Sequence, residues 1–300
     1  MATQVPRAEA EDAERHGPLP NYVIVGAPKS GTSSLARWLM DHPEAYLVPE
    51  KELHFFSHSW ELGLDWYRTR FAAGAGAKAI GEASPSYLAD DAAHERMASA
   101  IPGAKLIALL RNPVDRTYSH YWHWFDRKGE RRSFEQVVAD ELAAPDVTST
   151  RWDEDHPRAY SYLESGRYLR HVESLCRQFP REHVLVMLFE DLTEHSTDSF
   201  QQVCRFLGID DTVVPPVVGS TENAYRYYYP RWLWSLLVRV QIGRWIPGRA
   251  AGAIYRAMVR TADPYPPMDP AVRARLVEHF EPYNAALSEW LGRDLSHWSR

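Results

Sequence analysis

Short apolar runs without interruption recur along the first two thirds of the chain. Four of them predict buried parallel strands, at Tyr22–Gly26, Ala79–Ala83, Lys105–Arg111 and Val184–Glu190. The runs KLIALLR and HVLVMLFE lack the period of two that marks a strand with one face in water. We therefore expect these strands to be covered on both faces.

Helical spacing fills the intervals between these runs. The predicted helices are Thr32–Met40, Ser86–Ile101, Val114–Lys128 and Gly166–Phe179. Strands that alternate with helices predict an α/β fold, a P-loop-NTPase-like, doubly wound parallel sheet flanked by helices. Because ligands of such sheets bind beyond the carboxyl ends of the strands, we expect Gly26–Ser33 and Arg111–Asn112 on one rim.

Two regions depart from this alternation. Residues 1–20 are polar and acidic and have no apolar signal-peptide core, so they predict a disordered lead to a single domain at 21–300. Residues from about 221 to 261 are aromatic and basic and predict a C-terminal helical cap or insertion, followed by a helix from about Ala271 to Leu291. The helical spacing within the cap is clearest at Leu233, Leu236, Leu237 and Val240.

The aromatic and basic segment also allows a second interpretation. Its apolar stripe has Arg231, Arg239 and Arg244 close by, as in helices that lie on a membrane surface. Peripheral membrane contact through about 231–245 is thus the alternative to a cap over a substrate site. No run in the sequence approaches the roughly 20 apolar residues that span a bilayer.

Composition limits the partners and the compartment. The net charge of −6 gives no support for a nucleic-acid partner. Cys176 and Cys204 are too few for a disulfide framework or a metal cluster, and their sparseness agrees with a reducing compartment. We therefore expect no metal and a cytoplasmic location, with membrane association as the variant just described. The sequence gives no indication of the oligomeric state.

The segment VGAPKSGTSSL joins the first predicted strand to the first predicted helix. Gly26 and Gly31 match the nucleotide-binding pattern G-x-x-x-x-G-K-S/T, but the lysine position holds Thr32 and the lysine lies inside the loop, at Lys29. Free N–H groups and the helix dipole make such a loop an anion site. Its expected ligands come from Lys29, Ser30, Gly31, Thr32, Ser33 and Ser34.

Two further segments carry candidate chemistry. In RNPVDRTYSHY, Arg111 ends a strand and Ser119 lies about two helical turns later, a pair that can grip a second phosphate. In KELHFF, Glu52 and His54 precede an aromatic pair, and either side chain can act as a general base. Taken singly, each feature has an ordinary explanation as a strand end or a surface charge.

Together these segments resemble the PAPS-dependent sulfotransferases, most closely the Golgi heparan-type branch and its bacterial relatives. VGAPKSGTSSL is similar to the 5′-phosphosulfate loop of that family, and RNPVDRTYSHY is similar to its 3′-phosphate motif. KELHFF resembles the segment that carries a catalytic glutamate, and GEASPSYL matches the family pattern E-x-S/T-P-x-Y. The resemblance covers about residues 20 to 300.

The resemblance implies transfer of a sulfonate group from 3′-phosphoadenosine 5′-phosphosulfate (PAPS) to a hydroxyl or amine. Lys29 is then expected to stabilise the leaving oxygen, and Arg111 and Ser119 to hold the 3′-phosphate. Glu52 is the expected base, with His54 as the alternative base or as a donor that orients the sulfonate. The expected acceptor is a carbohydrate, a glycolipid or a small hydroxyl compound.

Two departures and two alternatives remain at this stage. Ala83 stands where some heparan-type enzymes have a lysine, which favours a less anionic acceptor, and Asp263 replaces a cation in a late nucleotide-contacting loop. A P-loop kinase is one alternative, with Glu82 or Glu190 as a candidate Mg²⁺ ligand, although Thr32 occupies its lysine position. A non-catalytic carbohydrate- or lipid-binding protein is the other.

Overall fold

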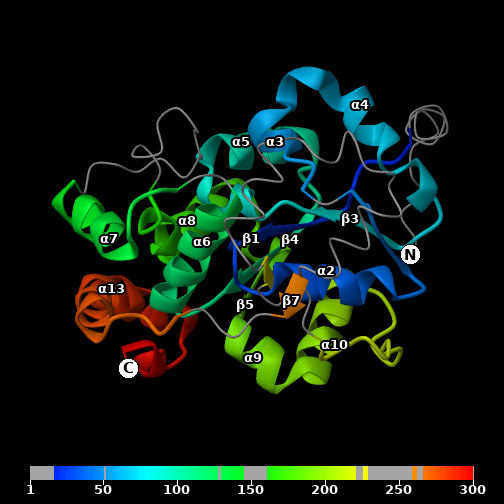
Figure 1. Cartoon of the computed structure of the whole chain (residues 1–300). Coiled ribbons are helices and arrows are strands. Elements are labelled where there is room, and N and C mark those ends of the chain that lie inside the picture. Colours follow the sequence, from blue (N-terminus) through cyan, green and yellow to red (C-terminus); the bar gives the residue numbers. More distant parts are fainter. Residues whose placement is uncertain are drawn as a thin grey trace.

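A five-stranded parallel sheet forms the centre of the molecule, in the order β2-β3-β1-β4-β5 (Figure 1). The computed structural model describes residues 17–50, 52–127, 130–144, 161–220, 226–228, 259–261 and 266–299. The strands are β1 Tyr22–Gly26, β2 Ala45–Leu47, β3 Ala79–Ala83, β4 Lys105–Leu110 and β5 Val184–Leu188.

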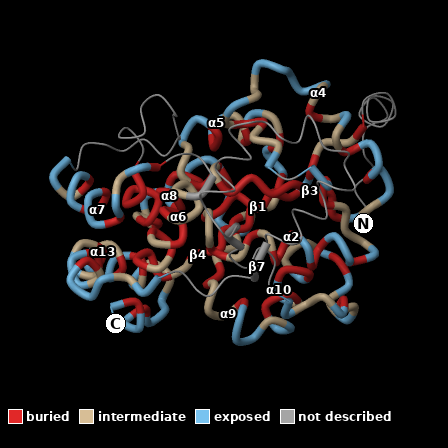
Figure 2. The backbone as a smooth tube through the Cα atoms, viewed as in Figure 1, coloured by how far each residue is buried: buried red, intermediate tan, exposed pale blue. Residues whose placement is uncertain are grey.

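Both faces of the sheet are buried, because successive strand residues point into two different cores. In β1, Val23 and Val25 belong to one core, whereas Tyr22 and Ile24 belong to the other. The central strands are accordingly buried along their length in Figure 2. This two-sided burial explains why the apolar runs show no alternation.

Helices cover each face of the sheet (Figure 1). Side chains of α2 (Thr32–Met40), α9 (Phe189–Glu194) and α10 (Ser196–Leu207) complete one core. The other core is completed from α3 (Phe55–His58), α4 (Gly63–Thr69), α5 (Asp91–Ala100) and α8 (Tyr168–Gln178). A third core joins α6 (Pro113–Arg127), α7 (Phe134–Ala143) and α13 (Pro270–Leu291). The predicted fold class is confirmed.

The predicted strands are all present, and the first two have the predicted bounds. The other two end earlier than expected, since Asn112-Pro113 leads into α6 and Phe189 already begins α9. The single helix predicted at Ser86–Ile101 is wrong. It is divided into a 3-10 turn, η3 (Pro85–Ala89), and α5, because the Asp90 side chain accepts a hydrogen bond from the Ala93 N–H at 3.1 Å and starts a new helix.

The ends of the chain differ in part from expectation. Residues 17–20, assigned to the disordered lead, are packed: the Arg68 Nε donates to the Gly17 oxygen at 3.1 Å, and Leu19 lies against the core. In the predicted helical cap, β6 (Arg226–Tyr228) pairs antiparallel with β7 (Val259–Thr261), so these positions are strands. The remainder of the cap, with the segment 231–245, lies outside the described residues, as does Asp263.

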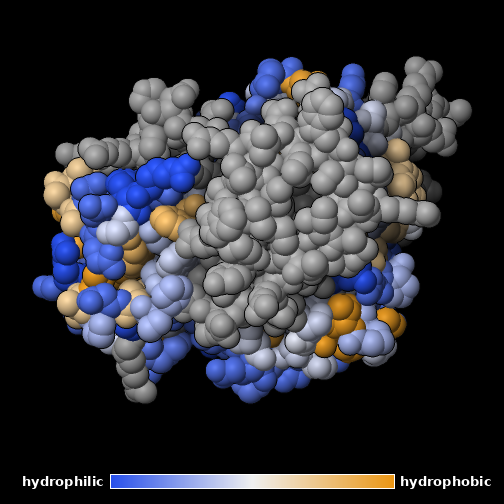
Figure 3. Space-filling view, in the orientation of Figure 1, coloured by the Kyte–Doolittle hydropathy of each residue, from blue (hydrophilic) through white to orange (hydrophobic). Residues whose placement is uncertain are grey.

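The described surface in Figure 3 is mainly hydrophilic, with hydrophobic residues scattered among polar ones. Of the helices in the described ranges, none combines the length and the apolar character needed to cross a bilayer.

Candidate active site

The predicted anion loop leaves the carboxyl end of β1 and enters α2. The Ala27 N–H donates to the Leu109 oxygen of β4 at 2.8 Å, which fixes the start of the loop against the neighbouring strand. Gly26 has no space for a side chain, since a Cβ there would come within 2.6 Å of the Pro85 oxygen and the Leu88 Cβ. Gly31 has φ +88° and ends the loop in the left-handed region that favours glycine.

The inside of the loop is lined by polar groups that suit an anion. The Ser30 side chain is fully buried, and its hydroxyl has no hydrogen-bond partner among the described residues. No side chain caps the start of α2 at Gly31, and the first N–H groups of a helix have no partners within it. Buried donors of this kind fit the oxygens of a bound phosphate or phosphosulfate.

Arg111 connects the loop to the next strand. It follows β4, and its Nη1 atom donates to the main-chain oxygen of Lys29 at 3.1 Å. Its guanidinium lies over the Phe189 ring at 4.7 Å from the ring centre. The predicted pairing of the loop with Arg111 on one rim is therefore present in the structure.

Ser119 lies on α6 and is 5% exposed. One helical turn before it, the fully buried Arg116 donates to the Thr117 Oγ1 at 3.0 Å, and its Nη1 lies 3.0 Å from the His120 Nδ1. Arg116 also donates to the main-chain oxygen of Tyr162. These bonds fix the face of α6 that carries Ser119.

No role was predicted for Arg116, His120 and Trp124 from the sequence, yet Arg116 and Trp124 each contact His120 on α6. The Trp124 Nε1 donates to the His120 Nε2 at 3.0 Å. Burial, together with the charges of Arg116, His123 and Lys29, lowers the pKa of His120 well below its ordinary value. The positive charge of Lys29 thus affects His120. Arg116, His120 and Trp124 are spaced by four residues, and this spacing in the sequence indicates that they share one face of a helix.

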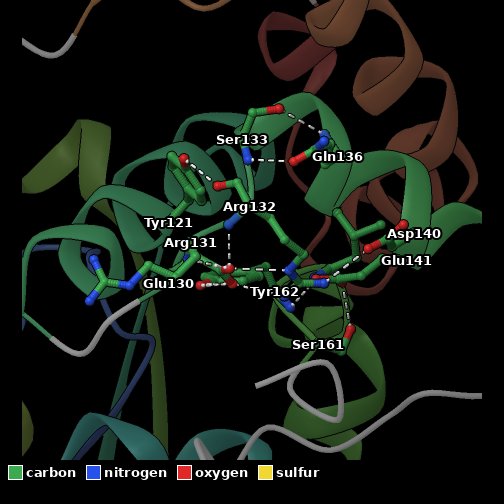
Figure 4. A network of polar contacts seen from close by, with 11 residues as sticks. Tyr121, Glu130, Arg131, Arg132, Ser133, Gln136, Asp140, Glu141, Ser161 and Tyr162 are labelled. Atoms are coloured by element: carbon green, nitrogen blue, oxygen red, sulfur yellow. Dashed lines mark hydrogen bonds and ion pairs between the residues drawn. The ribbon is translucent and has the colours of Figure 1, made fainter. Parts of the chain in front are cut away.

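A partly buried network of polar contacts is linked to Arg116 through Tyr162 (Figure 4). The Glu141 carboxylate accepts the Tyr162 N–H at 3.0 Å and the Leu163 N–H at 2.9 Å. Glu130 accepts the Arg132 Nη2 at 2.8 Å and the Tyr162 hydroxyl at 3.3 Å. Tyr162, whose main-chain oxygen accepts from Arg116, is therefore held at both its backbone and its side chain.

Glu52 and His54 form a pair beside Ser84 and Ser86, which follow β3. The Glu52 Oε2 and the His54 Nε2 are 3.2 Å apart, and the two side chains are 44% and 30% exposed, respectively. The other ring nitrogen of His54, Nδ1, lies 3.0 Å from the Ser86 Oγ. Both candidate bases are thus oriented by polar contacts and remain accessible to a substrate.

Three residues other than glycine have positive φ in the described part of the chain: Lys29 at 70°, Glu52 at 62° and His54 at 49°. Residues other than glycine rarely adopt this backbone conformation. It costs about 1–3 kcal/mol and is found most often at functional sites. The three residues predicted to be catalytic are therefore the three that carry this strain.

The segment Ser84–Leu88 brings the two parts of the site together. Gly26 packs against Pro85 and Leu88, while Ser84 and Ser86 bond to His54. Since β3 and β1 are neighbours in the sheet, the anion loop and the Glu52–His54 pair share this segment as a common support.

Of the two carboxylates considered as Mg²⁺ ligands, Glu82 has both oxygens bonded to protein hydroxyls, whereas the buried Oε2 of Glu190 has no hydrogen-bond partner among the described residues. Glu82 accepts hydrogen bonds from Tyr67, Ser84 and Tyr87. The Glu190 Oε1 accepts from the Asn112 N–H at 3.3 Å and the Trp298 Nε1 at 3.2 Å. Among the described residues, no group of three His, Cys, Asp or Glu side chains could hold a metal ion.

Comparison with known proteins decides the family. The sulfotransferase domain family matches residues 19–224, which include the loop, the Glu52–His54 pair and the Arg111–Ser119 segment. The chain belongs to the sulfotransferase family. The resemblance seen in the sequence motifs is thereby confirmed, and with it the expectation of an enzyme of this family.

Individual sulfotransferases are similar over most of the chain. A sulfotransferase crystal structure from Alicyclobacillus acidocaldarius is 31% identical with a TM-score of 0.70, covering 94% of this chain and 100% of that one. The mouse heparan sulfate glucosamine 3-O-sulfotransferase 3B1 is 30% identical over 191 residues, 64% of this chain and 46% of that protein. The human heparan sulfate glucosamine 3-O-sulfotransferase 6 is 27% identical over 276 residues, 92% of this chain and 72% of that protein.

These relatives correct one expectation. The predicted cytoplasmic location is wrong, because the related heparan sulfate sulfotransferases are Golgi luminal enzymes. The small number of cysteines was a poor guide to the compartment, since a large apolar core makes disulfides unnecessary for stability in any compartment. The matched part of this chain spans about half the length of the mouse relative, 46% of it.

Proposed function

We propose that this sulfotransferase moves a sulfonate group from PAPS to a hydroxyl or amine of a carbohydrate, glycolipid or small-molecule acceptor. The main support for this proposal is the hydrogen bond from the Arg111 side chain to the main-chain oxygen of Lys29. The loop that suits a 5′-phosphosulfate and the arginine that suits a 3′-phosphate are joined there by a hydrogen bond of 3.1 Å. PAPS bears both groups, whereas ATP bears no 3′-phosphate.

The 5′ end of the donor is assigned to the loop. Several donors lie at the N-terminal end of α2. They are the buried Ser30 hydroxyl, the N–H groups at Gly31 and Thr32, and the hydroxyls of Ser33 and Ser34. The helix dipole adds positive potential at the same place. The 3′-phosphate is assigned to Arg111 and Ser119, because a guanidinium and a hydroxyl together satisfy several phosphate oxygens.

We assign the transfer step to Lys29 and Glu52. The acceptor oxygen or nitrogen forms a bond to sulfur as the bond from sulfur to the bridging oxygen breaks. Glu52 accepts the proton that the acceptor loses, with His54 beside it as the alternative base. Lys29 stabilises the negative charge that collects on the bridging oxygen, as cationic groups do in phosphoryl transfer.

The kinase alternative has less support. Its lysine position holds Thr32, and the carboxylates proposed for Mg²⁺ are bonded to protein groups, Glu82 to three hydroxyls and Glu190 to Asn112 and Trp298. A non-catalytic carbohydrate- or lipid-binding protein could bind the same ligands as the enzyme but would form no product. The experiment must therefore measure product.

The test combines binding with product detection. Calorimetry of the purified chain should give tighter binding of adenosine 3′,5′-bisphosphate (PAP) than of ADP or ATP. Incubation with PAPS and a panel of oligosaccharides, glycolipids and small alcohols should then give a product heavier by one sulfonate. Binding of PAP without any product supports the non-catalytic alternative, and preference for ATP with Mg²⁺ supports the kinase.

A further inference from the structure

The Glu82 carboxylate is fully buried, and its contacts in the structure are with hydroxyl groups. Its Oε1 accepts from the Tyr67 hydroxyl at 2.6 Å and from the Tyr87 hydroxyl at 3.1 Å. Its Oε2 accepts from the Ser84 hydroxyl at 2.7 Å. Burial raises the pKa of Glu82, while these three hydrogen bonds and the charge of His54 oppose the rise.

Two of these hydroxyls also bind the backbone of the KELHFF segment. The Ser84 Oγ accepts the His54 N–H at 3.2 Å, and the Tyr87 hydroxyl oxygen accepts the Phe56 N–H at 3.3 Å. Each hydroxyl has one hydrogen, so a hydroxyl that accepts a backbone N–H gives its own hydrogen to Glu82. The carboxylate therefore fixes the direction of both hydroxyls.

The backbone held in this way is the strained turn of the active site. Glu52 and His54 have φ values of 62° and 49°, a conformation that persists only when the surrounding structure enforces it. The Ser84 contact lies at the peptide N–H of His54 itself. The direction in which Glu52 and His54 present their side chains depends on that peptide.

We propose that Glu82 is a positioning residue for the Glu52–His54 pair. It acts through Ser84 and Tyr87 on the backbone of the turn and touches neither base. This inference rests on the proposed function, in which Glu52 or His54 removes the proton of the acceptor. Loss of Glu82 then affects the chemical step more than donor binding, because its hydrogen bonds do not reach Lys29 or Arg111.

The protein offers a matched control in Tyr67. Its hydroxyl donates to the same carboxylate, but no further hydrogen bond of that hydroxyl leads to the turn. Tyr67→Phe and Ser84→Ala each remove one hydroxyl donor from Glu82, and Ser84→Ala alone also releases the His54 N–H. A general loss of stability affects both variants, whereas loss of positioning affects Ser84→Ala.

The test measures kcat, the KM for PAPS and PAP affinity in Glu82→Gln, Ser84→Ala and Tyr67→Phe, with folding checked by thermal unfolding. We expect kcat to fall by about tenfold or more in Glu82→Gln and Ser84→Ala, with KM and PAP affinity within about threefold of wild type. Tyr67→Phe should keep kcat within about threefold. If Glu82→Gln does not fold, the comparison of Ser84→Ala with Tyr67→Phe still decides the question.

A double variant separates this inference from the proposed function. If Ser84 acts through the turn, adding Ser84→Ala to Glu52→Gln should lower kcat by less than about twofold beyond Glu52→Gln alone. Equal losses of kcat in Tyr67→Phe and Ser84→Ala, or full additivity in the double variant, overturn the positioning role. Wild-type turnover by both Glu52→Gln and a His54→Asn variant instead overturns the assignment of the bases.

Discussion

The Nη1 atom of Arg111 lies 3.1 Å from the main-chain oxygen of Lys29 and joins the ends of two neighbouring strands. Lys29 belongs to the loop after β1, and Arg111 follows β4. The bond uses one of the five N–H donors of the guanidinium and leaves others for a ligand. Arg111 therefore holds the lysine loop in place and can bind the second phosphate of the same nucleotide.

Replacement of Arg111 should change nucleotide preference. Arg111→Ala is expected to weaken binding of PAP by about 10- to 100-fold, the usual value of a charge-assisted hydrogen bond. Binding of AMP, which has no 3′-phosphate, should be weakened less than binding of PAP, because AMP loses the support of the Lys29 loop but no direct contact with Arg111. Calorimetry with both nucleotides measures this, with Arg37→Ala as the control, because Arg37 is an exposed residue of α2 bonded to Asp41. An equal loss for AMP contradicts the assignment of Arg111 to the 3′-phosphate.

The backbone strain at Lys29 predicts a separation of stability from activity. Lys29→Ala and Lys29→Gly both remove the ammonium group, so both should lower kcat by about 10²-fold or more. At φ 70°, glycine avoids the steric cost that alanine retains, so the glycine variant should be about 1 kcal/mol more stable than the alanine variant. Urea unfolding of the two variants measures the difference. A glycine variant that is less stable than the alanine variant contradicts the left-handed conformation at Lys29.

Glu52→Gln should affect catalysis with little effect on donor binding. We expect kcat to fall by about 10²- to 10⁴-fold, because the amide cannot accept a proton, and PAP affinity to stay within about threefold. A variant that keeps most of its kcat assigns the role of base to His54, which lies 3.2 Å from Glu52.

The buried histidine of α5 predicts how stability depends on pH. Burial lowers the pKa of His94 to about 4, from an ordinary value of 6.5. The unfolded chain therefore binds more protons than the folded chain between these two values, so the free energy of unfolding should fall as the pH drops from about 6.5 to 4. The largest slope expected from His94 is about 1.4 kcal/mol per pH unit.

Chemical denaturation at several pH values measures this slope, in wild type and in a His94→Gln variant. The variant should lose the part of the slope that belongs to His94. The buried His120 contributes a slope of the same sign, since its pKa is also lowered, so it remains in both proteins. An unchanged slope in His94→Gln shows that His94 does not titrate in this range.

Most of the sheet could be predicted from the sequence, because β1 and β3 to β5 are largely buried runs of five or six mostly apolar residues. The three-residue strand β2 could not, since three residues are too few to show a period. The break in the predicted helix at Asp90 was missed because it depends on the hydrogen bond from the Ala93 N–H to the Asp90 side chain. The spacing of apolar residues does not reveal such a cap. The sequence thus predicts the longer strands well and the short elements poorly.

The residues of the candidate site could be predicted from sequence motifs, but their arrangement in space could not. The sequence marks Lys29, Arg111 and Glu52, since each lies in a recognisable pattern. It does not indicate that Glu82 is surrounded by hydroxyls, because Tyr67, Ser84 and Tyr87 meet only when α4, β3 and η3 pack together. The strain at Lys29, Glu52 and His54 is likewise a property of the backbone and is not visible in residue types.

The most direct test of the central claim is the transfer of radioactive sulfonate from PAPS to an acceptor by purified protein. Wild type, Lys29→Ala and Glu52→Gln should be compared at equal concentration with the best acceptor of the panel. We predict labelled product with wild type and a loss of about 10²-fold or more in rate for each variant. Labelled product formed at the wild-type rate by both variants, or no labelled product from wild type with any acceptor of the panel, contradicts the account.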